Sequence, residues 1–89
     1  MTFDAEKDSE LLKALGNPIR LKIVAGLMEH DGCNVSKMVD KLGISQSNVS
    51  QHLSILRRGG VLKATRKGTM TCFSIVDKRV IDIIKALKK

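Results

Sequence analysis

Between Ser45 and Arg58 the chain carries a run of short polar side chains whose chemistry suits the binding of nucleic acid. Amides and hydroxyls reach base edges and phosphate oxygens, whereas carboxylates would repel phosphate. No acidic residue occurs from Leu42 to Ile75, although a merely solvated helix face, the plain alternative, normally carries Glu and Lys. The candidate DNA-contacting residues of this run are Ser45, Gln46, Ser47, Asn48, Ser50, Gln51, His52, Ser54, Arg57 and Arg58.

The distribution of charge favours the same partner. The formal net charge is +7; the first ten residues hold four acids and one base, whereas residues 57–89 hold ten bases and two acids. A basic surface is typical of nucleic-acid binding, because neutralising phosphates releases counterions. A membrane partner is not expected, since no basic amphipathic helix is flanked by Trp or Phe. Without a long apolar run or a signal-peptide pattern, the expected location is the cytoplasm.

Enzymatic catalysis is not expected from this sequence. His30 and Cys33 could form a thiol–base pair, but an Asp-Gly turn separates them and no third group orients them. The chain has no glycine-rich phosphate loop, no paired carboxylates and no G-x-S-x-G motif. No cofactor is therefore expected.

An interaction module that docks its polar run on another protein is the main alternative to DNA binding. Protein interfaces are enriched in aromatic anchors, whereas this chain has only Phe3 and Phe73. Steep salt dependence of duplex binding would separate the two functions.

Two short helical patterns joined by a turn must position the polar run. In Val35–Leu42, apolar residues recur at i, i+3, i+4 and i+7 and form one face. Gly43 follows at a helix end that favours positive φ, and Ser45 is placed as the N-cap of a second helix. Ile44 before this cap can pack on the second helix, which ends at Arg58. This pattern predicts a helix-turn-helix whose second helix enters the major groove.

Three more helices are expected, at Ala5–Leu15, Pro18–His30 and Lys78–Lys89. Gly16, Asn17 and Pro18 separate the first two, with Asn17 as a cap, and Asp77 is the expected cap of the last. Arg20 and Lys22 point away from the apolar stripe of their helix. They are either solvated or placed to contact a DNA backbone.

A short β-hairpin is predicted after Gly59-Gly60, with strands at Val61–Arg66 and Met70–Val76. The three-residue sequence Lys67-Gly68-Thr69 is the expected turn. A basic hairpin beside a recognition helix is a wing that can reach the minor groove or the backbone, although an ordinary solvated turn is the alternative. The wing residues expected to contact DNA are Arg66, Lys67 and Thr69.

The first and last helices carry wide apolar bands, formed by Leu11, Leu12 and Leu15 and by Val80, Ile81, Ile83, Ile84 and Leu87. The last band is too wide for one contact in a small domain, so we expect a homodimer through these two helices. The alternative is that both bands close the core of a lone domain.

The segments Leu11–Val24, L-L-K-A-L-G-N-P-I-R-L-K-I-V, and Leu42–Leu62, L-G-I-S-Q-S-N-V-S-Q-H-L-S-I-L-R-R-G-G-V-L, resemble the ArsR-type (ArsR/SmtB) winged helix-turn-helix repressors. The resemblance covers about Glu10 to Val76. The length of 89 residues predicts a single domain, residues 1–89, and the resemblance implies a mostly α-helical fold with four helices, a hairpin and a last helix. It also implies a homodimeric bacterial or archaeal repressor that binds a pseudo-palindromic operator in double-stranded DNA and releases it when an effector engages the protein.

The metal sites of that family do not carry over to this chain. The C-x-C pair of one site falls on Asn34 and Ser36, and neither is a soft ligand. The second site uses Asp, His, His and Glu on the last helix, which here contains no His. The resemblance therefore leaves the effector unidentified and gives no expected metal site.

The fold implied by the resemblance places the segment around Cys33 beside the strand that contains Cys72. If their Cα atoms lie within about 4.4–6.8 Å, a disulfide or a short polysulfide bridge becomes possible. Three alternatives remain open: a thiol switch that responds to reactive sulfur or an oxidant, plain packing of two small apolar side chains, and a metal site that adds His30.

Overall fold

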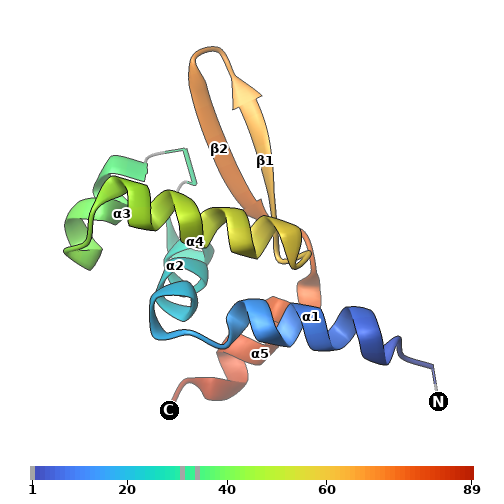
Figure 1. The fold of residues 1–89 in the computed structure, drawn as a ribbon. Coiled ribbons are helices and arrows are strands. Elements are labelled where there is room, and N and C mark those ends of the chain that lie inside the picture. The colour runs from blue at the N-terminus through green and yellow to red at the C-terminus, as the bar shows by residue number, and fades with distance from the viewer. Residues whose placement is uncertain (1, 31, 34) are drawn as a thin grey trace.

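The structure, a computed structural model, describes residues 2–30, 32–33 and 35–89, with only the backbone of Val35 and Ser36. The described part of the chain is mostly helical with one antiparallel hairpin, as expected (Figure 1). The elements are α1 (Ala5–Leu15), α2 (Pro18–Glu29), α3 (Val35–Leu42), α4 (Gln46–Arg58), β1 (Leu62–Lys67), β2 (Met70–Ile75) and α5 (Lys78–Leu87). The expected turn residue Asp31, the family metal position Asn34 and the side chain of Ser36 lie outside the described residues.

Polar side chains begin four of these helices: Asp4 caps α1, and the sequence predicts the other three caps. The Oδ1 atom of Asn17 accepts hydrogen bonds from the backbone N–H groups of residues 19 and 20, at 2.8 and 3.2 Å. Ser45 Oγ accepts from the backbone N–H of Asn48 at 3.2 Å, and Asp77 caps α5. Gly43 ends α3 with a φ of 68°. The turn between α3 and α4 is therefore held by the predicted residues.

Helix α4 lies against the core, which also receives side chains from α1, α2, α5 and the start of the hairpin. Val24, Val49, Leu56, Val61 and Val80 are each fully buried. Burying a side chain of this size stabilises the fold by about 1.5–3 kcal/mol. The other buried apolar core residues are Leu11, Ala14, Leu15, Ile23, Leu53, Leu62 and Ile84.

The end of α4 passes very close to α1. A Cβ atom added at Gly59 would lie 2.5 Å from the Cβ of Ala14, a residue that is itself buried. The close approach of the two helices therefore requires glycine at position 59.

The hairpin stands out from the helical body (Figure 1), and its turn is shorter than predicted. Lys67 pairs with Met70, so the turn consists of Gly68 and Thr69 alone, not of three residues. Gly68 has a φ of 62°, whereas no described non-glycine residue has positive φ. Glycine at the first central position of a two-residue turn fits the right-handed twist of the strands, which explains the difference.

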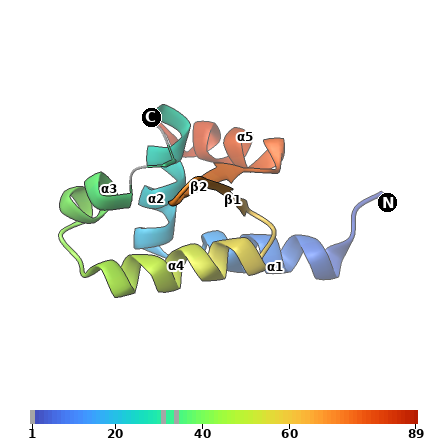
Figure 2. The same ribbon diagram turned by 90° about the horizontal axis from the view of Figure 1, so that it is seen from above.

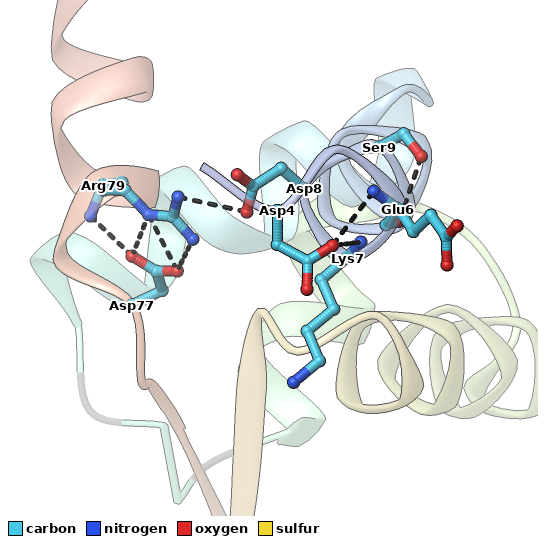
Figure 3. Close-up of polar contacts among 7 residues, drawn as sticks. All are labelled: Asp4, Glu6, Lys7, Asp8, Ser9, Asp77 and Arg79. Carbon is cyan, nitrogen blue, oxygen red and sulfur yellow. Dashed lines mark hydrogen bonds and ion pairs between the residues drawn. The ribbon is translucent and has the colours of Figure 1, made fainter. Parts of the chain in front are cut away.

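An ion-pair network joins the start of α5 to α1 (Figure 3). Arg79 donates to Asp77 Oδ2 at 2.7 Å and to Asp8 Oδ1 at 3.1 Å. The side-chain and backbone hydrogen bonds from Arg79 hold the pKa of Asp77 below its ordinary value. The network therefore contributes to the relative position of the two helices expected to form the dimer.

The apolar bands of α1 and α5 are divided between the core and the surface. Leu11, Leu15 and Ile84 are buried, whereas the exposed fractions of Leu12 and Leu87 are 55% and 63%. Each band thus closes the core and leaves apolar surface uncovered. Among the described residues, no helix is long and apolar enough to cross a membrane.

Candidate nucleic-acid interface

The outer face of α4 is polar because the helix turns its apolar residues inward. Val49, Leu53 and Leu56, at i, i+4 and i+7, are buried. The opposite face of a 3.6-residue helix then carries Ser47 and Gln51, both of which are exposed. Figure 2 shows α4 on the side of the body away from α5, so its outer face is clear of that helix. The remaining candidates on α4 that are exposed are Gln46, Asn48, Ser50, Arg57 and Arg58, while His52 and Ser54 are half-buried.

Not every candidate has the same surroundings. Ser45 Oγ lies 3.2 Å from Ser47 Oγ while also accepting the capping bond, so both hydroxyls belong to the start of α4. Arg58 lines a groove with the acidic residues Asp4, Asp8 and Asp77 at the other end of the helix. Arg58 therefore lies on the same groove as acidic residues, and its Nε atom donates to the carbonyl of Ser54 at 3.5 Å.

The wing candidates lie at the tip of the hairpin. Arg66 and Lys67 are the last residues of β1, Thr69 is in the turn, and all three are exposed. Arg66 pairs with Thr71 across the hairpin, so the tip contains no carboxylate. Two basic side chains are thus available to an anionic partner at a distance from α4.

Arg20 is not simply solvated, and its side chain makes contacts within the protein. Its Nε atom donates to the carbonyl of Ala14 at 2.6 Å, and its Nη1 atom lies 3.3 Å from Nδ1 of His52. Arg20 is half-buried and joins the end of α1 to α4, whereas Lys22 is exposed. The sequence showed only that Arg20 leaves the apolar stripe of α2, because a contact across 32 residues leaves no local pattern.

Cys33 and Cys72 meet and form a disulfide bond. Their Cα atoms are 4.0 Å apart, slightly closer than the range set from the sequence, and Cys72 is buried. Next to the bond, the N–H of Phe73 donates to the carbonyl of Gly32 at 3.0 Å. A Cβ at Gly32 would meet the carbonyl oxygen of Phe73, so glycine permits this approach. The bond joins the segment before α3 to the wing, and plain packing of two separate thiols does not describe this pair.

The alternative metal site of Cys33, Cys72 and His30 is not assembled. Both sulfurs are used in the disulfide, and Nε2 of His30 lies 3.5 Å from Nζ of Lys41. In the described ranges, no group of three or more His, Cys, Asp or Glu residues could hold a metal ion.

Comparisons with known proteins agree with this architecture. Residues 17–64 match the bacterial regulatory proteins of the arsR family. The chain is 44% identical over 80 residues to an uncharacterized HTH-type transcriptional regulator, MJ1325, of Methanocaldococcus jannaschii, with 90% of each chain covered. It is 46% identical over 82 residues to the transcriptional repressor PagR of Bacillus anthracis, covering 92% of this chain and 82% of PagR.

Solved structures confirm the winged helix-turn-helix fold. The crystal structure of PagR superposes with a TM-score of 0.83, covering 93% of this chain and 94% of the other. A winged helix-turn-helix DNA-binding domain from Mycobacterium bovis, described as homodimeric, has the same fold at 23% identity. Its TM-score is 0.80, covering 98% of this chain and 86% of that domain.

Proposed function

Because this chain belongs to the arsR family of bacterial regulatory proteins, we propose that it is a cytoplasmic transcriptional repressor that binds a pseudo-palindromic operator in double-stranded DNA. The observation that carries this proposal is the acid-free outer face of α4 beside a basic wing. Its family consists of DNA-binding regulators rather than enzymes.

We divide the candidate contacts into two classes. Gln46, Ser47, Asn48, Gln51 and His52 lie on the half of α4 that follows its N-cap, and we assign them to base edges. We assign the remaining candidates to the phosphate backbone of the DNA. They are Ser45, Ser50, Ser54, Arg57, Arg58, Arg66, Lys67 and Thr69.

The active form in this proposal is a homodimer through α1 and α5. The exposed side chains of Leu12 and Leu87 would be covered by a second copy, which would place two α4 helices about 34–36 Å apart in successive major grooves. In sedimentation experiments, Leu87→Glu should give monomers, whereas Lys85→Glu on the exposed surface of the same helix should leave the dimer intact. Equal effects of the two variants would contradict this interface.

The DNA-binding proposal is tested in two steps. Duplex DNA is selected from a random pool, and its affinity for the protein is then measured by fluorescence anisotropy over a range of salt concentrations. A repressor with six to ten phosphate contacts should lose about 10³–10⁵-fold in affinity between 50 and 200 mM salt. No enrichment of any sequence, together with salt-independent binding, would favour the protein-interaction module instead.

A thiol switch is the second part of the proposal, and the bond between Cys33 and Cys72 supports it. This bond ties the segment before α3 to β2, so breaking or forming it changes how the wing is held relative to the helix-turn-helix. We assign operator binding to the dithiol form and release to the disulfide form.

The chemistry of the switch balances with a polysulfide as the oxidant. One thiolate attacks a sulfane sulfur to form a persulfide and releases a polysulfide that is shorter by one sulfur. The second thiolate attacks the cysteine sulfur of that persulfide, which closes the disulfide and releases hydrosulfide. The two cysteine sulfurs are together oxidised by two electrons, and the sulfane sulfur is reduced by two.

Fluorescence anisotropy of duplex DNA tests the switch. Binding is measured with reduced protein, with the same sample after polysulfide treatment, and with that sample after a thiol reductant. Tight binding should be lost and then restored, and Cys33→Ser and Cys72→Ser should bind under all three conditions. Unchanged binding of the wild-type protein, with mass spectrometry confirming the disulfide, would contradict the switch without affecting the DNA-binding proposal.

A further inference from the structure

We propose that Arg20 fixes the tautomer of His52 and thereby makes the Nε2–H group of this histidine an obligate hydrogen-bond donor toward DNA. The assignment of the donor to DNA rests on the proposed function, whereas the tautomer is a property of the free protein. Arg20 is thus a positioning residue for recognition, although it lies on α2.

The guanidinium of Arg20 is held from three directions. Its Nε atom donates to the carbonyl of Ala14 at 2.6 Å, and its Nη2 atom donates to the carbonyl of Lys13 at 3.4 Å. These carbonyls are at the C-terminal end of α1, where a cation is favoured, and the carbonyl of Lys13 also accepts from the backbone N–H of Gly16. The third nitrogen, Nη1, lies 3.3 Å from Nδ1 of His52. The guanidinium therefore has a fixed orientation before it meets the imidazole.

The contact between Arg20 and His52 allows one assignment of the imidazole proton. A guanidinium is always protonated, and it has five N–H donors and no acceptor. Nδ1 of His52 must then supply its lone pair. A neutral imidazole that accepts at one nitrogen carries its proton on the other, so Nε2 of His52 bears the hydrogen.

The Nε2–H group of His52 is available for an external acceptor. Among the described residues, the only hydrogen-bonding contact of the His52 side chain is the one with Arg20. The His52 side chain is half-buried, so part of it remains at the surface of α4. In the major groove, a donor can bond to a purine N7, guanine O6 or thymine O4, whereas the amino group of cytosine offers only a second donor. The fixed tautomer therefore makes His52 discriminate against cytosine at the position that it faces.

Long-range proton–nitrogen correlation spectra of ¹⁵N-labelled free protein test the tautomer directly. In a buffer alkaline enough to keep imidazoles neutral, His52 should show a protonated Nε2 and an unprotonated Nδ1. His30 is the only other histidine and contacts Lys41 instead, so it serves as an internal control. A protonated Nδ1 on His52 would overturn the proposal whatever the protein binds.

Substitutions of Arg20 distinguish its effect on the His52 tautomer from its effect on the stability of the fold. Arg20→Gln removes the obligatory donor, so we expect the nitrogen shifts of His52 to move toward a mixture of tautomers while those of His30 stay unchanged. Arg20→Lys keeps the positive charge but not the fork that spans α1 and α4, and it should give an intermediate result. Unaltered His52 shifts in both folded variants would overturn the role of Arg20. The wild-type spectrum tests the tautomer even if neither variant folds.

Variants of His52 test the use of the donor on a selected duplex. The amide of His52→Gln lies near the position of Nε2 and can donate, whereas the amide of His52→Asn lies near Nδ1 and faces Arg20. We expect His52→Gln to bind within about threefold of the wild-type protein and His52→Asn to bind about tenfold more weakly. Equal affinity of the two variants would overturn the donor role. Failure of the wild-type protein to bind any duplex would instead overturn the proposed function, and the spectra would still decide the tautomer.

Discussion

Reduction of the bond between Cys33 and Cys72 should lower the free energy of unfolding by about 4 kcal/mol. The two residues are separated by 39 positions. The entropy that a cross-link removes from an unfolded loop of this length is about 13 cal/mol/K, which corresponds to about 4 kcal/mol at 25 °C. The hydrogen bond from Phe73 N–H to the carbonyl of Gly32 does not involve the sulfurs, so we expect it to persist after reduction. The loop constraint is therefore the main difference between them.

This difference is large for a domain of 89 residues. At about 0.05–0.15 kcal/mol per residue, the whole domain is stable by only about 4–13 kcal/mol. The reduced protein is then the less stable form, and dimerisation contributes more to keeping it folded.

Guanidinium chloride unfolding of oxidised and reduced protein measures the effect. With a slope of about 2 kcal/mol/M, the midpoint should fall by about 2 M on reduction. Both samples must have the same protein concentration, because the stability of a dimer depends on it. A Cys33→Ser/Cys72→Ser variant is the control and should match the reduced protein with or without reductant. A difference below about 1 kcal/mol between oxidised and reduced protein would refute the loop argument.

Three further predictions concern other parts of the chain. Gln51→Ala should relax sequence preference in anisotropy competition, whereas Lys67→Ala should weaken all duplexes about equally and lower the salt slope by about one unit; identical behaviour would contradict the division of roles. Gly59→Ala should destabilise the fold by about 1–3 kcal/mol in chemical unfolding because its Cβ overlaps α1, whereas Gly26→Ala, which meets nothing within 4 Å, should stabilise it by about 0.5–1 kcal/mol. Asp77→Ala should cost about 1 kcal/mol at neutral pH through the lost cap, and Asp77→Asn should cost less. The folded-state pKa of Asp77 is lowered, so the stability that its charge contributes is fully present above the ordinary aspartate pKa and is lost as the pH falls below it. The difference in free energy of unfolding between the wild-type protein and Asp77→Ala should therefore become smaller at acidic pH.

Local chemistry made most of the fold predictable from the sequence. Asn17, Ser45 and Asp77 cap the predicted helices because each side chain bonds to backbone atoms two or three residues away. Gly43 has the expected positive φ for an equally local reason. The polar face of α4 follows from the period of its apolar residues, which a single sequence displays.

Contacts between distant segments were harder to predict. Nothing in the sequence shows that Gly59 lies against Ala14, since that approach depends on the angle between two helices. The exposure of Leu12 beside buried Leu11 and Leu15 depends on how α1 is rotated on the core, which the apolar band alone leaves open. The meeting of Cys33 and Cys72 was predicted only through the resemblance to a known fold.

The disulfide closes a covalent ring from residue 33 to residue 72, and every residue assigned to DNA lies inside that ring. Helices α1, α2 and α5 belong to the two tails that leave it. In the proposed switch, chemistry at the sulfurs changes the segment that carries the DNA contacts and leaves the proposed dimerisation helices outside the ring. We therefore expect the protein to release its operator without separating into monomers. A single protease cut at the exposed hairpin tip would leave the oxidised chain in one piece, and only a reducing gel would show two fragments.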